Sequence, residues 1–97
     1  MQDPEVSKRF VVHGRVQGVG FRDSVCRFAW KLGGLKGHVR NTRDGRVEVC
    51  VTAAPQKVDE LRVFLRQGPP LARVDRLDEQ PLDPPAPAGP FCIVFGG

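Results

Sequence analysis

Hydrophobic and polar residues alternate in several short stretches of this chain, as they do in strands that bury one face of a sheet. The first stretch runs from Lys8 to His13, with β-branched and aromatic residues at its centre. The next two, Lys36–Asn41 and Arg46–Thr52, flank Asp44-Gly45, which readily takes the positive φ angles of a hairpin turn. A fourth strand is predicted over Arg73–Glu79, and a short last one around the apolar positions Phe91, Ile93 and Phe95.

Two other stretches follow the helical period. A helix is expected from about Arg22 to Leu32, because Val25, Phe28, Ala29 and Leu32 are spaced as one apolar face, and Gly33-Gly34 would end it. A second helix is expected from Pro55, which suits a first helical turn, to a stop at Gly68-Pro69-Pro70. The apolar positions of this second helix are Val58, Leu61, Phe64 and Leu65.

The element order is β-α-β-β-α-β with a short extra C-terminal strand. This order is typical of an α+β sandwich in which two helices cover one face of an antiparallel sheet. The 97 residues suffice for one compact domain, which we assign to residues 8–97 after a polar N-terminal tail at residues 1–7. Residues 81–90 hold five of the nine prolines and are expected to form a loop.

Composition narrows the function classes only a little. The formal net charge is +4, and the cations are spread along the chain, so a nucleic acid and a small anion are equally compatible partners. No apolar run approaches the ~20 residues that cross a bilayer, and the polar N-terminus lacks a signal core, so we expect a cytoplasmic protein without membrane contact. The three cysteines form no CxxC pair, and no metal site is expected.

The glycine-rich segment between the first strand and the first helix is the most informative stretch. Three glycines lie within the seven residues from Gly14 to Gly20, and they allow successive backbone N–H groups to converge on an anion. The helix N-terminus that follows adds further N–H groups, and Arg22 brings a planar guanidinium that can grip two phosphate oxygens. No Lys-Ser/Thr pair follows the glycines, so a nucleotide-binding P-loop is not indicated. A plain turn between strand and helix remains the alternative.

Two blocks of sequence settle the interpretation in favour of a site. The segments His13–Arg22 (HGRVQGVGFR) and Gly37–Glu48 (GHVRNTRDGRVE) resemble the two signatures of the acylphosphatase family, in the same order and in a chain of the family's length. The resemblance covers nearly all of residues 8–95. It implies the ferredoxin-like sandwich, a fold that agrees with the element order derived above.

The resemblance also implies an activity and its residues. The chain would be an enzyme that hydrolyses a small-molecule acyl phosphate to a carboxylate and inorganic phosphate, without metal or other cofactor. A monomer is expected, although the sequence leaves the oligomeric state open. Arg22 falls at the family's phosphate-binding arginine and Asn41 at its water-positioning asparagine. The phosphate cradle would be the backbone N–H groups of Gln17, Gly18, Val19, Gly20 and Phe21. One departure bears on geometry: Gly33-Gly34 stands where the family usually has one glycine, which could displace Asn41 relative to Arg22.

Other interpretations remain open at this level. Asn41 could serve only as a turn residue before the hairpin. The side chain of Gln17 is expected to be solvated, and His13 and His38 are expected to be structural. An RNA-binding module on the same fold is disfavoured because Arg46–Thr52 contains no aromatic residue on which a base could stack. An accessory domain with little hydrolytic activity, of the kind found inside larger maturation proteins, is the second rival.

Overall fold

The structure, a computed structural model, describes residues 4–95 of the chain. Its element order confirms the β-α-β-β-α-β prediction with a short additional strand at the C-terminal end. The elements are β1 (Val6–Arg15), α1 (Phe21–Leu32), β2 (Lys36–Asn41), β3 (Val47–Ala53), α2 (Pro55–Gln67), β4 (Arg73–Pro81) and β5 (Cys92–Ile93).

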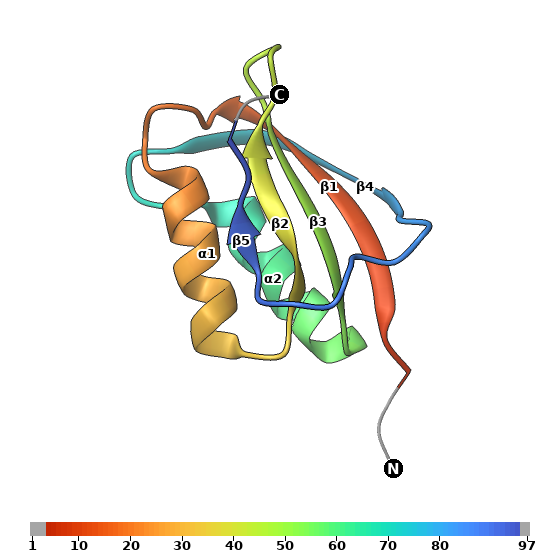
Figure 1. The fold of residues 1–97 in the computed structure, drawn as a ribbon. Helices are drawn as coiled ribbons and strands as arrows, with labels where there is room; N and C mark the ends of the chain where they lie inside the picture. The colour runs from red at the N-terminus through yellow and green to blue at the C-terminus, as the bar shows by residue number, and fades with distance from the viewer. Residues whose placement is uncertain (1–3, 96–97) are drawn as a thin grey trace.

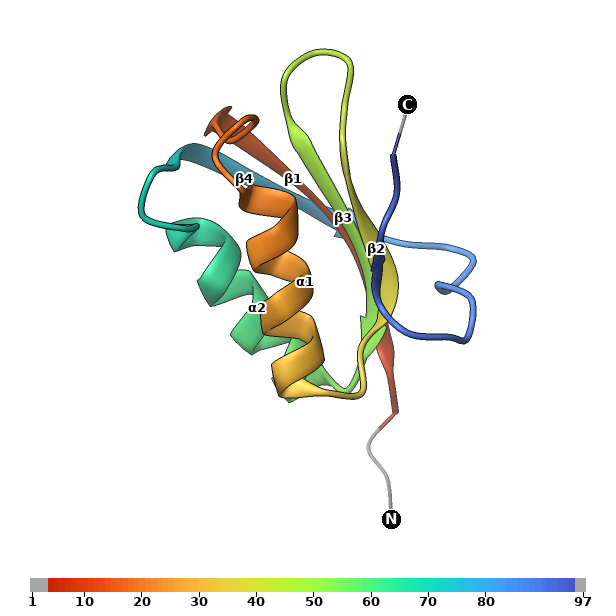
Figure 2. The same ribbon diagram turned by 60° about the vertical axis from the view of Figure 1, so that its left-hand side comes forward.

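The strands form a single sheet in the order β4-β1-β3-β2-β5, with both helices packed on one face (Figures 1 and 2). The strands β1 and β2 each pair antiparallel with β3, so β1 and β2 run in the same direction. The last strand, β5, pairs parallel with β2. The C-terminal ends of β1, β2 and β5 therefore meet at one end of the sheet, where α1 also begins.

The core lies between the sheet and the helices, and the alternation in the sequence explains it. Phe10 and Val12 of β1 are fully buried, and so are the three valines of β3 at 47, 49 and 51. The helices contribute Val25 and Ala29 from α1 and Val58, Leu61 and Leu65 from α2, positions that the helical period predicted. Both helices, of 12 and 13 residues, are too short and too polar to span a bilayer.

The strand β1 begins earlier than the sequence pattern predicted. Val6 and Ser7 belong to it, paired with Ala53 and Thr52, although both were expected in the N-terminal tail. A hydrogen bond between the hydroxyls of Ser7 and Thr52, 2.8 Å apart, explains how a polar position joins the sheet. Residues 1–3 of the expected tail lie outside the described part of the chain.

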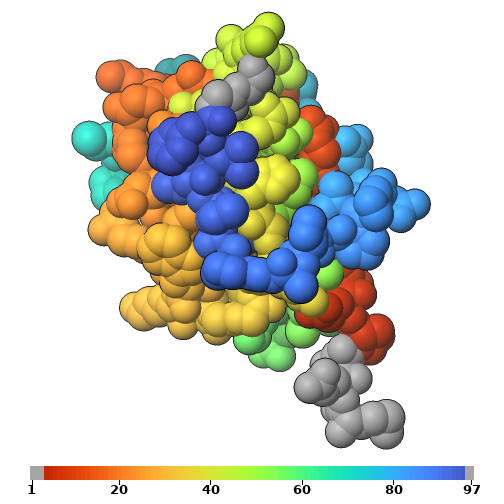
Figure 3. Space-filling model, viewed as in Figure 1, coloured from red at the N-terminus to blue at the C-terminus, as the bar shows by residue number. Residues whose placement is uncertain are grey.

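The proline-rich loop crosses the open face of the sheet, away from the helices, to carry the chain from one sheet edge to the other (Figure 2). Its anchors are backbone N–H groups: Leu82 donates to the Ser7 carbonyl at 3.2 Å and Ala86 to Oγ1 of Thr52 at 2.9 Å. The segment that follows lies on the surface beside β2 and α1 (Figure 3). There the Trp30 indole donates to the Phe91 carbonyl at 2.6 Å, although Trp30 is 58% exposed.

Glu48 sits at the centre of the open face and is only 6% exposed. Its two carboxylate oxygens accept hydrogen bonds from Nε of Arg9, at 2.6 Å, and Nε of Arg40, at 2.7 Å. Burial alone would raise the pKa of Glu48, but the hydrogen bonds from Arg40 and Arg9 outweigh it and lower this pKa below 4.5. Glu48 therefore remains a carboxylate at neutral pH and joins three strands of the sheet.

Replacing this carboxylate should destabilise the fold in a pH-dependent way. We expect Glu48→Gln to lower the free energy of unfolding by about 1–3 kcal/mol at pH 7, because two guanidinium groups lose a charged acceptor. The stabilisation by Glu48 is present above the pKa of the unfolded chain, near 4.5, and is lost as the pH falls through the lower folded-state pKa. Urea denaturation at pH 7 and near pH 3 measures this, with the exposed Glu60→Gln as control. If the difference in unfolding free energy between wild type and Glu48→Gln is the same at the two pH values, Glu48 does not stabilise the fold as a carboxylate.

Candidate functional site

The loop between β1 and α1 has the backbone geometry of an anion cradle. Gly18 and Gly20 take positive φ angles of 73° and 76°, and no non-glycine residue in the described chain has a positive φ. The sign of φ thus alternates from Gln17 to Gly20, which turns successive N–H groups toward one side. None of these four N–H groups donates to a backbone carbonyl within residues 4–95. The cradle therefore keeps its donors for a ligand.

Arg22 lies in the first turn of α1, immediately after the cradle, and its side chain is half-buried. The guanidinium carbon stands 5.1 Å from the centre of the Phe95 ring. No carboxylate within residues 4–95 pairs with Arg22, because its neighbour Asp23 instead contacts Arg27, at 3.0 Å. Arg22 is thus held by an aromatic face that leaves its N–H donors available.

Asn41, the last residue of β2, lines the same cavity as Arg22 and the cradle. The volume of this cavity is about 280 Å³, and its wall includes Gly18, Gly20, Phe21, Arg22, Asp23, Asn41 and Phe95. Of the site residues predicted from sequence, Arg22, Asn41, Gly18, Gly20 and Phe21 line this one cavity, whereas Gln17 and Val19 are not among its lining residues. The glycine pair does not separate them: the Gly33 N–H caps α1 on the Ala29 carbonyl at 2.9 Å, and Asn41 still reaches the cavity wall.

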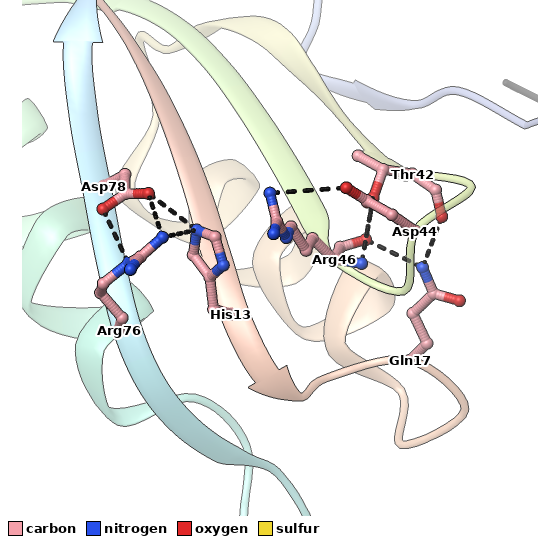
Figure 4. Close-up of polar contacts among 7 residues, drawn as sticks. All are labelled: His13, Gln17, Thr42, Asp44, Arg46, Arg76 and Asp78. Carbon is pink, nitrogen blue, oxygen red and sulfur yellow. Dashed lines mark hydrogen bonds and ion pairs between the residues drawn. The ribbon is translucent and has the colours of Figure 1, made fainter.

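Two residues of the predicted cradle use their side chains elsewhere. Val19 packs against the hydrophobic core. The side chain of Gln17 was expected in solvent, and that prediction is wrong: its amide nitrogen donates to the carbonyls of Thr42, at 2.8 Å, and Arg46, at 2.9 Å (Figure 4). Sequence patterns gave no indication of this contact, because a glutamine in a glycine-rich loop reads as solvated.

The wall that Phe95 forms was also missed. The alternation of Phe91, Ile93 and Phe95 predicts a short last strand around all three positions, but β5 covers only Cys92–Ile93. Phe91 is buried, whereas Phe95 lies beyond the strand and is 74% exposed, beside Arg22. The sequence did contain one indication of this contact. Arg22 follows β1 and Phe95 follows β5, and these two strands end at the same end of the sheet.

The open face of the sheet holds a larger hollow, of about 640 Å³, lined by Arg9, Arg40 and Arg46 among others. We do not assign the site there, because each of these arginines contacts a carboxylate, Glu48 for the first two and Asp44 for the third. His13 is likewise engaged: its Nε2 lies 2.8 Å from Asp78, which Arg76 also contacts (Figure 4).

The sequence suggested no metal site, yet the fold brings three potential ligands together on the open face. The donor atoms of His38, Glu48 and Cys50 all lie within 4.8 Å of one another. Both oxygens of Glu48 are already engaged by guanidinium groups, and burial is the main cause that raises the pKa of the Cys50 thiol. This cluster is therefore best described as part of the ion-pair network that joins the strands.

The contact between Arg22 and Phe95 gives a testable consequence. We expect Phe95→Ala to weaken binding of inorganic phosphate about 2–5-fold, because a cation–π contact is worth about 0.5–1 kcal/mol at an exposed site. The melting temperature should hardly change, since the ring is mostly exposed. Phe95→Tyr retains the aromatic face and serves as the matched control. Equal phosphate affinity in the alanine variant and the wild type would show that the ring does not hold Arg22.

Comparison with known proteins agrees with this geometry. The sequence model of the acylphosphatase family matches residues 8–93. An acylphosphatase of Halorhodospira halophila is 44% identical over 91% of this chain and 95% of its own length. The structure of an acylphosphatase from Coxiella burnetii superposes with a TM-score of 0.86 at 31% identity, covering 94% of each chain. The T. kodakarensis HypF structure matches at 32% identity and a TM-score of 0.73 over 93% of this chain but only 12% of its own. With the family model and a close full-length relative in agreement, this chain belongs to the acylphosphatase family.

Proposed function

We propose that this chain hydrolyses the carboxyl–phosphate bond of a small acyl phosphate, with the cradle and Arg22 binding the phosphate and Asn41 positioning the attacking water. The observation that carries the proposal is one cavity that Arg22, Asn41 and the glycines of the loop line together. Two features support a dianion there: within residues 4–95 the N–H groups of residues 17–20 donate to no backbone carbonyl, and no carboxylate pairs with the Arg22 guanidinium.

The reaction suits a site with so few groups. The leaving group is a carboxylate, whose conjugate acid has a pKa near ~4, so it departs without a general acid. Phosphoryl transfer requires mainly in-line positioning and stabilisation of charge on the equatorial oxygens. The backbone N–H groups and Arg22 supply that stabilisation, and they do so without reorganisation because loop and helix fix them in advance.

Asn41 has the donor and the acceptor needed to orient one water molecule. An amide is too weak a base to remove a proton from that water, so in this proposal the proton passes to a phosphate oxygen. The bond from the water oxygen to phosphorus forms as the bond from phosphorus to the acyl oxygen breaks. The products are the carboxylate and inorganic phosphate, and no metal ion takes part.

The two rival functions have less support. The central strands present Arg9, Val11 and His13 from β1 and Glu48, Cys50 and Thr52 from β3 on the open face, with no Phe, Tyr or Trp among them. The imidazole of His13 is the one ring in this set, and its Nε2 is engaged by Asp78 at 2.8 Å. An accessory role without turnover is the alternative suggested by likeness to a small part of a longer protein. Turnover by the isolated chain distinguishes it from the enzyme.

Steady-state hydrolysis of benzoyl phosphate in the presence of EDTA tests the proposal. We expect the wild type to be active, Asn41→Ala to lose kcat by about 100-fold or more, and Arg22→Ala to be nearly inactive. Arg22→Lys should also lose most activity, because an ammonium cannot grip two phosphate oxygens in a fixed plane. Arg66→Lys, an exposed position in the last turn of α2, is the matched control. Full activity of Arg22→Lys, or activity that EDTA abolishes, contradicts the mechanism.

A further inference from the structure

The side chain of Gln17 connects the two halves of the site. Its backbone belongs to the cradle, whereas its amide reaches out of the loop to the hairpin between β2 and β3 (Figure 4). One amide nitrogen, which carries two N–H donors, meets two carbonyl oxygens, those of Thr42 at 2.8 Å and Arg46 at 2.9 Å. The donor set of the glutamine matches the pair of acceptors.

These two carbonyls belong to the neck of the hairpin. The Thr42 N–H donates to the Arg46 carbonyl at 2.9 Å, and the Arg46 N–H donates to Oγ1 of Thr42 at 3.0 Å. The Thr42 hydroxyl also contacts Asp44, which closes the turn. The neck is thus rigid by itself, and Gln17 fixes this rigid unit relative to the loop.

The position of the neck matters because Thr42 directly follows Asn41. A shift of the neck relative to the loop therefore moves the Asn41 amide relative to the bound phosphate. Gln17 is half-buried, and its side chain is absent from the cavity wall that Arg22 and Asn41 form. Its amide consequently acts through the hairpin and has no direct contact with a ligand in that cavity.

We infer that Gln17 is a positioning residue: its amide sets the distance and orientation of Asn41, and hence of the attacking water, relative to the phosphate cradle. The inference rests on the proposed function, because it assigns Asn41 the water. Misplacement of a reacting group by ~1 Å costs about 100-fold in rate, so two hydrogen bonds that fix a hairpin can have a large kinetic effect. Phosphate binding depends on the loop backbone and Arg22, and is therefore unaffected by the amide.

A kinetic comparison separates positioning from a general structural role. Gln17→Met keeps the length of the side chain without its donors, and Gln17→Glu keeps its shape while directing a carboxylate at two carbonyl oxygens. We expect both variants to lower kcat at least about tenfold, with the inhibition constant of inorganic phosphate changed by less than about twofold. Gln56→Met, at an exposed position in the first turn of α2, is the matched control and should behave as the wild type.

The double variant tests whether Gln17 acts through Asn41. In an Asn41→Ala background, Gln17→Met should lower kcat by less than about twofold, because the group that it positions is gone. An unchanged kcat in both single variants, an equal loss of phosphate binding, or effects that multiply in the double variant each overturn the inference. If Gln17→Met fails to fold, as its circular dichroism would show, Gln17→Glu gives the same comparison.

A spectroscopic measurement keeps the inference separate from the proposed activity. Asn41 is the only asparagine in the chain, so labelling with ¹⁵N-asparagine gives one side-chain amide pair that reports on this residue. We expect Gln17→Met to shift or broaden that pair, while Gln56→Met leaves it unchanged. If Gln17→Met changes the Asn41 signal but the wild type does not hydrolyse acyl phosphates, the proposed function is wrong and the positioning role stands. A signal identical in wild type and Gln17→Met defeats the positioning role, whatever the activity.

Discussion

The site depends on the direction of three strands. Because β1 and β2 both pair antiparallel with β3, they run the same way, and β5 joins them by pairing parallel with β2. Their C-terminal ends therefore reach one end of the sheet, where the glycine loop, Asn41 and Phe95 follow in turn. Because α1 follows β1 through the glycine loop, its N-terminus also lies at this end of the sheet. The helix thus adds its unpaired N–H groups where an anion would lie. Hydrogen bonding of the sheet thus determines the separation of groups that are far apart in sequence.

Sheet pairing alone leaves the final position of the hairpin undetermined, since a hairpin projects beyond the last ladder bond. Gln17 supplies the missing constraint by linking loop and hairpin at two carbonyls. Pre-organisation of this kind is the main way in which a site with few chemical groups stabilises a transition state. On the open face, too, one side chain links separate segments, because Glu48 accepts hydrogen bonds from both Arg9 and Arg40.

Local patterns in the sequence predicted most of the fold, because alternation and helical period are set by which residues face the core. The apolar stripes of both helices and the buried valines of β3 lie where the periods placed them. The start of β1 was not predictable in this way, since the Ser7–Thr52 hydrogen bond joins residues 45 positions apart. The same limit applies to the site: the motifs indicated Arg22, Asn41 and the loop, whereas the contacts of Gln17 and Phe95 depend on how distant segments meet.

Arg22 and the arginines on the open face have different partners, an aromatic ring in the first case and a carboxylate in the second, and the difference has a physical reason. Arg9 and Arg40 share a buried carboxylate, which compensates their charges and also occupies donors. A carboxylate beside Arg22 would stabilise the free protein, but it would compete with a phosphate for the same N–H groups and repel it. The guanidinium carbon of Arg22 instead lies over the Phe95 ring, 5.1 Å from its centre, and no carboxylate within residues 4–95 pairs with this guanidinium. Asp23, the nearest carboxylate along the chain, lines the same cavity, but it pairs with Arg27 one helical turn later, at 3.0 Å, and not with Arg22. An aromatic partner for Arg22 is therefore an arrangement that holds the side chain in place and leaves its donors to the dianion that the proposed function requires.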